Sequence, residues 1–354
     1  MALQMFTNRN DLSRIMADLP VGDLAAQDLA RGRQGELTKP PGSLGRLEDV
    51  AIHLAGWHGG RPLAPKVSAD VIKVVIFAGN HGVVARGVSP YPADVTAQMV
   101  GNFSAGGAAI NALTEAFGLS LDVVALDLDK PTRDMTIAPA MSEVETIAAL
   151  NIGAGVVGDD IDVLCLGEMG IGNTTVAAAL CSRALGGRGK DWAGPGTGLD
   201  AGGVSHKASV IDQAIKCHAA LPLEAFETLR CVGGRETAAI AGAVLAARMK
   251  RIPVVLDGYV VSAAIAPLFA EEAGIVAHCI AGHVSAEPAH SRLLQHLGLS
   301  ALLDLSMRLG EGSGAALGAQ IIRAAAATHN NMATFAEAAV SNRAKEQGDD
   351  IGHG

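Results

Sequence analysis

The sequence predicts an α/β fold with a doubly wound, mostly parallel, Rossmann-like sheet and a smaller helical second domain. Apolar, β-branched runs such as residues 71–78 and 161–166 are followed by glycine-containing loops and then by helix-favouring segments, and this order recurs along the chain. Of the 354 residues, 49% are hydrophobic but only 3% are aromatic, and 43 are glycine. The core is therefore built from small aliphatic side chains, as where helices pack on sheets.

Composition excludes several classes of function. The net charge of −9 and the lack of a basic run argue against a nucleic-acid partner. Apolar runs such as 237–247 are too short to span a bilayer, and the first ten residues lack a signal core, so we expect a cytoplasmic protein without a membrane partner. Five scattered cysteines, never spaced C-x-x-C, argue against a disulfide framework or a zinc site.

The N-terminal part is expected to form the second domain. Residues 1–70 contain an amphipathic helical segment to about residue 35, an irregular loop with two prolines, and a helix to about residue 57. We expect this lobe, completed by C-terminal helices at about 328–345, to cover the carboxyl edge of an α/β domain at 71–327. Residues 346–354 are expected to be a disordered tail.

The first strand, at 71–78, leads into Asn80 and His81, which lie between two glycines. Open α/β sheets bind ligands beyond the carboxyl ends of their strands. A direct role for His81 and a loop histidine bonded to the backbone both remain open. A short helix at about 94–101 carries Gln98, which matters only if the helix faces the site, and a second strand follows at 121–126.

Residues 166–175 pass from a strand through a glycine loop into a helix. Glu168 lies at the strand end, where a carboxylate can accept hydrogen bonds from sugar hydroxyls, and Asn173 is expected to cap the helix. Free amides at a helix start bind anions. The formal G-x-G-x-x-G at 153–158 is not a dinucleotide fingerprint, because a helix precedes it and a strand follows.

Residues 194–207 supply a second glycine-rich loop and helix. Gly196 and Thr197 offer backbone amides, and Lys207 is a compact cation suited to phosphate, although a lone lysine is usually solvated. Asp257 follows a strand at 252–256; a helix at 259–269 and a strand at 275–280 come next. The downstream side chains His283, Glu287 and His290 match no metal-binding helix motif.

Glu311 is the only charged side chain among three glycines at 310–314, just before an alanine-rich helix for which Ser313 is the expected N-cap. A solvated loop acid is the alternative interpretation. If a ligand closes over the loop, burial would raise the pKa of Glu311 into the range that suits a general base.

Together these loops predict a cleft with two carboxylates, one cation and several free amides. Such a cleft fits a sugar phosphate and a transfer reaction at its anomeric carbon. No metal or cofactor is required if the leaving group departs from a cationic glycosidic nitrogen, because bond breaking neutralises it.

A series of motifs resembles one enzyme family, the nicotinate-nucleotide:dimethylbenzimidazole phosphoribosyltransferases of cobalamin lower-ligand synthesis. The resemblance covers about residues 38–340 in order, and the motifs are highly specific as a set. They are KPPGSLG at 39–45, FAGNHGV at 77–83, QMV at 98–100, GGAAIN at 106–111, GEMGIGNTT at 167–175, GTGL at 196–199 and LGEGSG at 309–314.

The resemblance implies that nicotinate mononucleotide and 5,6-dimethylbenzimidazole give α-ribazole 5′-phosphate and nicotinate, with inversion, in a Rossmann-like homodimer. The resemblance also implies that Glu311 is the general base. It implies that the ribose phosphate is contacted by Glu168, Gly170 and Lys207, and that the pocket for the aromatic base is lined by Gln98, Leu309 and Gly310. Asn80 departs from the aspartate that many relatives carry, which leaves the preferred aromatic base less secure than the reaction.

Two alternatives remain at this stage. A nucleotide-dependent oxidoreductase would need a dinucleotide fingerprint in the right context, which is missing. A non-catalytic nucleotide or α-ribazole binding protein could keep the phosphate loops, but it would have no need of the isolated Glu311.

Overall fold

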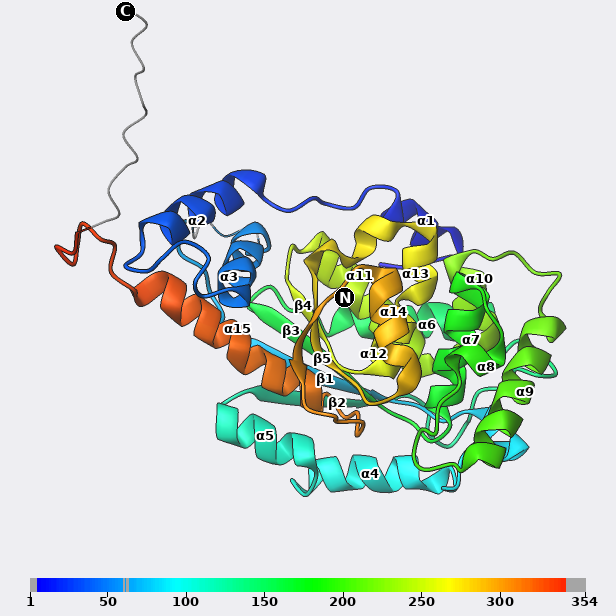
Figure 1. The fold of residues 1–354 in the computed structure, drawn as a ribbon. Coiled ribbons are helices and arrows are strands. Elements are labelled where there is room, and N and C mark those ends of the chain that lie inside the picture. Colours follow the sequence, from blue (N-terminus) through cyan, green and yellow to red (C-terminus); the bar gives the residue numbers. More distant parts are fainter. Residues whose placement is uncertain (1–4, 60, 62–63, 342–354) are drawn as a thin grey trace, which may run out of the picture.

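The computed structural model describes residues 5–59, 61 and 64–341, and is built on a six-stranded sheet (Figure 1). Every strand pair is parallel, and the order across the sheet is β2-β1-β3-β4-β5-β6. The strands are β1 (Ile72–Ala78), β2 (Ser120–Ala125), β3 (Val163–Met169), β4 (Val254–Leu256), β5 (Cys279–Val284) and β6 (Ala301–Asp304). The predicted doubly wound parallel sheet is confirmed.

The strand order locates the ligand crevice of the sheet. From β1 the chain adds β2 on one side, and then crosses to add β3 on the other. At such a switch point the loops beyond the two carboxyl ends diverge and leave a crevice. The loops after β1 and β3 are those that carry Asn80, His81 and Glu168.

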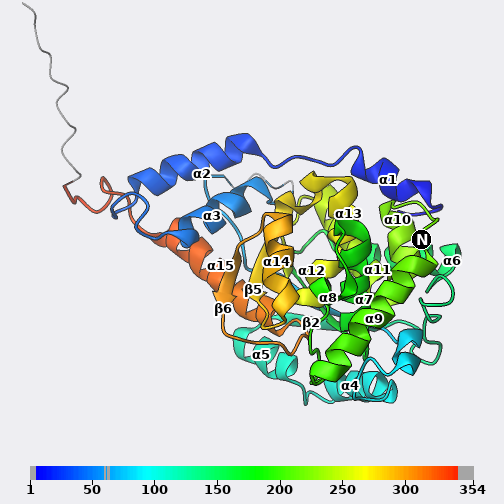
Figure 2. The same ribbon diagram turned by 45° about the vertical axis from the view of Figure 1, so that its right-hand side comes forward.

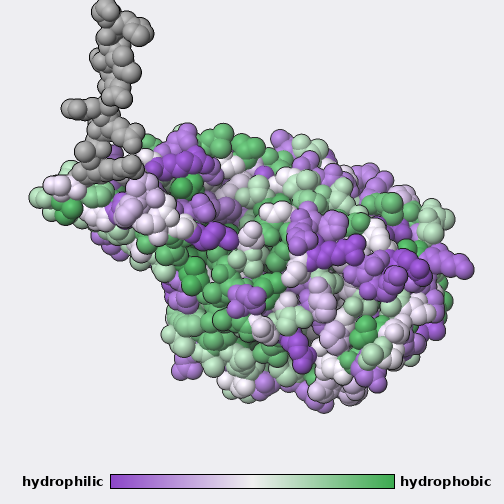
Figure 3. Space-filling model, viewed as in Figure 1, coloured by the Kyte–Doolittle hydropathy of each residue, from purple (hydrophilic) through white to green (hydrophobic). Residues whose placement is uncertain are grey.

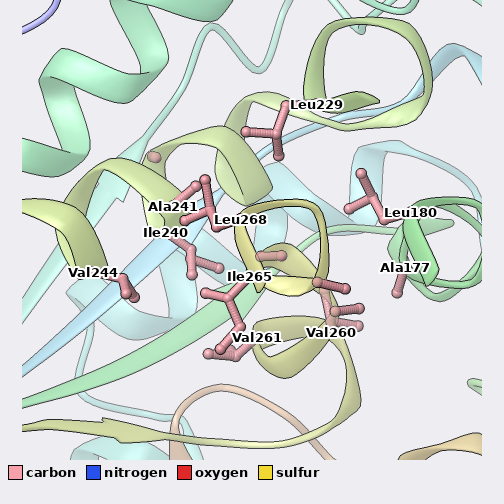
Figure 4. Close-up of a cluster of buried hydrophobic side chains, with 14 of the residues drawn as sticks. Ala177, Leu180, Leu229, Ile240, Ala241, Val244, Val260, Val261, Ile265 and Leu268 are labelled. Carbon is pink, nitrogen blue, oxygen red and sulfur yellow. The ribbon is translucent and has the colours of Figure 1, made fainter. Parts of the chain in front are cut away.

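One face of the sheet carries the larger hydrophobic core. Buried side chains of α6 (Glu143–Gly155), α7 (Asn173–Leu185), α11 (Arg235–Met249), α12 (Tyr259–Ala264) and α13 (Ala266–Glu271) meet there. Figure 4 shows part of this core, where Ile240 and Val244 of α11 lie beside Val261 and Ile265. Farther out lie α8 (Gly189–Trp192), α9 (Ala201–Cys217), α10 (Ala225–Val232) and α14 (Pro288–Leu297).

The other face is covered by α3 (Arg46–Gly56), α5 (Ala109–Phe117) and α15 (Ser313–Asn331), with α4 (Asp94–Ser104) beside β2. Val74 of β1, Cys165 of β3 and Ala315 of α15 share this second core with Val50 and Leu54 of α3. Helix α2 (Leu24–Glu36) packs on α3 and adds Ala26 and Ala30 to the same cluster. The apolar side of the small lobe is thus continuous with the sheet core.

The lobe lies at the opposite end of the sheet from the predicted one. The Arg46 guanidinium donates to the carbonyl oxygen of Ser300, just before β6 begins, and the amide of Gly59 donates to Arg251 O, just before β4. These are amino ends of strands. The expectation that the lobe covers the carboxyl edge was therefore wrong. Helix α15 runs antiparallel to β6, so its C-terminal half, on which the lobe packs, lies near the amino ends of the strands.

The predicted membership of the lobe also needs correction. Helix α1 (Asn10–Met16) packs against α10, and Leu12 and Ile15 belong to the larger core, so α1 lies apart from α2 and α3 (Figures 1 and 2). The expected C-terminal helices at 328–345 appear only as the end of α15; residues 332–341 form turns and a bridge between Leu37 and Thr334. Residues 342–354, including the expected tail, lie outside the described residues. The domain boundary at residue 70 stays a prediction.

The largest differences between predicted and observed elements of the α/β domain lie at 259–269 and 275–280. The helix expected at 259–269 is split into α12 and α13, because Pro267 in the first turn of α13 cannot donate to a preceding carbonyl. The strand expected at 275–280 begins only at Cys279, after a 3-10 helix at Ala273–His278. A short apolar run does not distinguish a buried strand from a buried helical turn.

The surface is unevenly polar. In the view of Figure 3, hydrophobic residues gather in the middle of the molecule below the lobe, and hydrophilic residues dominate the right-hand side. Among the described helices, none has both the length and the apolar character needed to cross a membrane.

Candidate active site

A pocket opens beyond the carboxyl ends of β3, β4 and β5. Its volume is about 630 Å³, counted with the space open to solvent. Five segments line it: the β3–α7 turn, residues 196–197, the start of α12, the segment after β5, and residues 308–310. These segments are far apart in sequence, and the parallel sheet brings them to one edge.

Glu168 occupies the floor of this pocket. Its side chain is buried near the end of β3, and the amide of Asn173 donates to its Oε2. Burial raises the pKa of Glu168 well above its usual range, and the charges of Asp257, Glu236 and Glu311 add to this effect. Asn173 was expected to cap α7, but it is the first residue of the helix and its side chain binds Glu168. The residue before the helix is Gly172, which lies in the left-handed region.

Glu311 lies on the loop that touches the end of β3. Its backbone N–H donates to the carbonyl oxygen of Glu168 at 3.3 Å. Glu311 has φ of +62°, which is uncommon for a residue with a side chain, and Gly310 and Gly312 on either side are also left-handed. Strained backbone of this kind clusters at functional sites.

The side chain of Glu311 is largely buried. Only 5% of the residue is exposed, and among the described residues its Oε2 has no hydrogen-bond partner. Burial raises the pKa of Glu311, and the nearby charge of Asp257 raises it further. The side chain does not itself line the pocket, whereas its neighbours Leu309 and Gly310 do.

The start of α15 differs from the prediction. Ser313 is the first residue of the helix and not its N-cap; its hydroxyl donates to Gly310 O at 2.8 Å. The amides of Gly312 and Ala315 instead donate to the Asp257 carboxylate, at 3.2 and 2.9 Å. Asp257, expected to bind substrate, is fully buried and does not line the pocket.

Lys207 lies just behind the pocket wall. Its ammonium donates to Thr174 Oγ1 and to Gly194 O, both at 3.0 Å, and it is 3.1 Å from the place a Cβ would take on Gly196. Burial lowers the pKa of Lys207 to about 8, which the nearby carboxylate of Glu287 partly opposes. Thr174 and Gly196 both line the pocket, whereas Lys207 does not.

A second cation was missed by the sequence reasoning. Arg308 lines the pocket, and its Nη1 donates to Gly196 O at 3.1 Å. On the other side of the same loop, Glu287 Oε1 accepts from the Gly196 amide at 2.6 Å. Burial raises the pKa of Glu287, with Lys207 the largest opposing influence. In the sequence, the only signal for a role of Arg308 in the pocket was that it directly precedes the 309–314 motif.

The residues after β1 form a layer behind the pocket. His81 Nε2 lies 3.0 Å from Glu236 Oε1, with both side chains fully buried, although the geometry is not that of a hydrogen bond. The amide of Asn80 donates to Leu128 O at 3.0 Å. A Cβ on Gly170, which lines the pocket, would come within 3.1 Å of His81. Gln98 is exposed on α4, outside the pocket lining.

The pocket lining therefore contains six of the twelve residues singled out in the sequence: Glu168, Gly170, Gly196, Thr197, Leu309 and Gly310. Glu311, Lys207, Asp257, Asn80 and His81 lie buried next to it or behind it. Besides Arg308, the sequence reasoning missed lining side chains that include Thr174, Tyr259, His283, Ser285 and Glu287. Three of these, His283, Ser285 and Glu287, lie at or just after the end of β5, a strand end that had been weighed only for metal binding.

Within the described part of the chain, no three His, Cys, Asp or Glu side chains are grouped as a metal site would require. Of the side chains weighed as metal ligands, His290 is already engaged by the protein. Its Nδ1 accepts from the Ser285 amide at 2.8 Å, and its Nε2 lies 3.1 Å from Ser262 Oγ, so both ring nitrogens are already engaged.

Comparisons with known proteins identify the family of the chain. A family model described as "Phosphoribosyltransferase" matches residues 19–340. The protein of Novosphingobium aromaticivorans named nicotinate-nucleotide–dimethylbenzimidazole phosphoribosyltransferase is 60% identical over 325 residues, covering 92% of this chain and 95% of its own. The protein of that name from Rhodobacter capsulatus is 51% identical over 332 residues, covering 94% and 97%.

A solved structure extends the likeness to the fold. The phosphoribosyltransferase of that name from Thermus thermophilus is 38% identical, with a TM-score of 0.82, over 91% of this chain and all of its own. With its parallel sheet and its acid-bearing loops at the carboxyl edge, the chain belongs to the nicotinate-nucleotide–dimethylbenzimidazole phosphoribosyltransferase family.

Proposed function

We propose that the protein transfers the 5-phosphoribosyl group of nicotinate mononucleotide to 5,6-dimethylbenzimidazole, giving α-ribazole 5′-phosphate and nicotinate. One observation carries the proposal. The loops of Glu168 and Glu311 touch through a backbone hydrogen bond beside a single pocket, so two buried acids with raised pKa values converge on one place. Paired acids in such surroundings are typical of proton-transfer sites.

The chemistry follows from charge. The glycosidic nitrogen of nicotinate mononucleotide is cationic, and departure of nicotinate neutralises it. Attack on C1′ from the opposite face inverts the β-nucleotide to an α-riboside. The attacking benzimidazole gains positive charge, and Glu311 is proposed to take the proton from its other ring nitrogen. A base with a raised pKa accepts that proton readily near neutral pH.

Glu168 is proposed to lie beside the ribose. In the free protein its raised pKa favours the neutral acid. The cationic ring nitrogen of the bound nucleotide would favour the carboxylate, because an opposite charge nearby lowers the pKa of an acid. The ionised Glu168 would then stabilise the positive charge that develops at C1′ as nicotinate leaves.

The phosphate is proposed to bind at the other end of the pocket. Amides of the β3–α7 turn, including Gly170, supply donors at a helix start, and Thr197 adds a loop amide; the Gly196 amide is already held by Glu287, so Gly196 contributes close backbone approach. Lys207 supplies positive charge from behind the 194–197 loop, and Arg308, which lines the pocket, supplies it beside Gly196. The base pocket is proposed to involve Leu309, Gly310 and Gln98, with Asn80 and His81 in the layer behind.

The direct test is to incubate the purified protein with nicotinate mononucleotide and dimethylbenzimidazole and to measure free nicotinate and α-ribazole 5′-phosphate. We expect both products, formed in equal amounts. A protein that binds the nucleotide without releasing nicotinate would be a sensor, and the transferase proposal would be wrong.

We further propose a cytoplasmic homodimer without a cofactor, as the family resemblance implies. Sedimentation equilibrium over a range of protein concentrations tests the dimer. A single species at the mass of one chain, 36.0 kDa, would reject it.

A further inference from the structure

We propose that Asp257 and His283 are a positioning pair that fixes the first turn of α15 and, through it, the base Glu311. The pair also connects this turn to the sugar in the pocket. The inference rests on the proposed function in assigning Glu311 the role of base and in placing the ribose of a nucleotide in the pocket. Neither Asp257 nor His283 needs to touch the reacting atoms.

Asp257 supplies a helix cap from a distant strand. The first amides of a helix have no partner within the helix, and here the expected cap position is Gly312, which has no side chain. Asp257, directly after β4, fills the gap: its Oδ2 accepts from Gly312 N at 3.2 Å and its Oδ1 from Ala315 N at 2.9 Å. A carboxylate is also favoured by the positive end of the helix dipole.

This cap acts directly on Glu311. The Gly312 amide belongs to the peptide bond that follows Glu311. The hydrogen bond from this N–H to Asp257 therefore limits rotation of that peptide group and helps to orient the strained residue Glu311. On the other side, the Glu311 amide is held by the carbonyl oxygen of Glu168. Glu311 is therefore held by hydrogen bonds to both of its peptide groups, and Asp257 makes one of the two.

His283 connects the cap to the pocket. It lines the pocket near the end of β5, is 2% exposed, and places Nε2 3.7 Å from Asp257 Oδ1. Its ring lies against the first turn of α15, where a methyl group on Gly314 would overlap the imidazole. Among the described residues neither ring nitrogen has a hydrogen-bond partner.

Buried polar groups are almost always paired, so an unpaired imidazole in a pocket wall indicates a partner that arrives with the ligand. The ribose hydroxyls of a nucleotide match it, because they both donate and accept. A hydroxyl bound to His283 would fix the ring between Asp257 and Gly314. Nucleotide binding would then stiffen the same turn that aligns Glu311.

The test compares Asp257→Asn with Asp162→Asn. Asparagine keeps the shape but turns one acceptor oxygen into an NH₂ group, so one amide of α15 loses its partner. Asp162 is a matched control: it is also buried and also accepts two backbone amides, from Asp70 and Val71 at 2.8 and 2.9 Å, but before β3, at the opposite edge of the sheet.

For Asp257→Asn we expect faster hydrogen exchange at the 312–315 amides. We also expect a kcat about 10²-fold lower, as for a base misplaced by about 1 Å, with the nucleotide dissociation constant nearly unchanged. For Asp162→Asn we expect lower thermal stability without either effect. Wild-type exchange at 312–315 in Asp257→Asn, or a retained kcat, would overturn the positioning role.

His283→Gln tests the link to the sugar. In the wild type, saturating nicotinate mononucleotide should slow exchange at 312–315, whereas in His283→Gln this protection should be lost and the nucleotide KM should rise about 10-fold, as for one lost hydrogen bond. Equal protection in both proteins would refute the link. The exchange measurements need no turnover. If no nicotinate is released by the wild type, the proposed function fails, while the effect of Asp257 on the turn is still decided.

Discussion

Glu311 combines two features that a surface loop acid lacks, a left-handed backbone and a buried carboxyl oxygen, Oε2, without a partner among the described residues. Each is unfavourable for folding by itself, since strained dihedrals cost on the order of 1–3 kcal/mol. The neighbouring glycines confine that strain to one residue. A side chain kept in this state suits a reaction in which it must accept a proton from a bound, apolar base.

Replacing Glu311 by glutamine should remove the base and keep the shape. We expect nicotinate mononucleotide to bind with its normal dissociation constant while turnover falls by about 10²–10⁴-fold. Calorimetric titration and a nicotinate-release assay measure the two quantities. Glu143→Gln, an exposed substitution on α6, serves as the control and should behave like the wild type. Near-normal turnover in Glu311→Gln would refute the assignment.

Lys207 gives a prediction about pH. Its pKa is lowered to about 8 by burial, so the ammonium is charged below that pH and neutral above it. If it attracts the phosphate, the KM for nicotinate mononucleotide should be constant below about pH 7.5 and rise between pH 8 and 9.

Steady-state kinetics across this pH range check the Lys207 prediction. In Lys207→Gln the KM should be raised below about pH 8, where the wild-type ammonium is charged, and the rise near pH 8 should be absent. Lys190→Gln, which changes an exposed lysine, should keep the wild-type profile. A flat wild-type profile would remove Lys207 from the phosphate site.

At the scale of elements, the close crossing of α6 and α11 shapes the larger core. Gly153 and Gly242 sit where a Cβ would overlap the backbone carbonyl of Ala239 or Leu150 on the facing helix. Neither glycine has a positive φ, so close approach is what requires them. The 153–158 run that imitates a dinucleotide motif is in this respect a packing feature.

Substituting Gly242 by alanine should force the two helices apart. We expect a loss of about 1–3 kcal/mol in the free energy of unfolding, the usual cost of overpacking a core. Gly155→Ala is the control on α6, because nothing lies within 4 Å of its added Cβ, and it should cost nothing. Urea denaturation followed by circular dichroism measures both. Equal stabilities would show that the crossing relaxes freely.

The elements themselves were largely predictable because each buried strand is a continuous apolar run. Helix caps were less so. Asn173 and Ser313 have the right chemistry for a cap, but glycine precedes each helix, and the amides of α15 are satisfied by Asp257, which is far away in the chain. Similarly, the acids Glu168 and Glu311 could be found from the glycines that flank them in sequence. The positions of Arg308 and His283 in the pocket could not, because they follow from which loops meet in the folded protein.

At the scale of the whole molecule, the position of the lobe could not be predicted. Periodicity identifies helices but does not say which end of a sheet they cover. The deciding contacts are long-range: Arg33 of α2 donates to the carbonyl oxygens of His329, Asn330 and Met332 at 2.8–3.2 Å, satisfying the end of α15.

Removing the Arg33 guanidinium should therefore loosen the lobe. We expect Arg33→Ala to lower the free energy of unfolding by about 2 kcal/mol, since hydrogen bonds from charged groups are the stronger ones. Hydrogen exchange should accelerate in α2 and at 329–332. Arg31→Ala, which removes an exposed i,i+3 pair with Asp28 and a long, exposed hydrogen bond to Gln27, should change little. Identical exchange in both variants would mean that packing alone holds the lobe.

The unbroken course of α15 has a mechanical consequence. Its 19 residues span about 28 Å, from the Glu311 loop to the carbonyls gripped by Arg33. Because the helix is continuous and is hydrogen-bonded at both ends, a displacement of one end would also displace the other. A partner that docked on α2 and α3 and shifted the C-terminal end of α15 would therefore also shift the Glu311 loop, which is remote from the docking site.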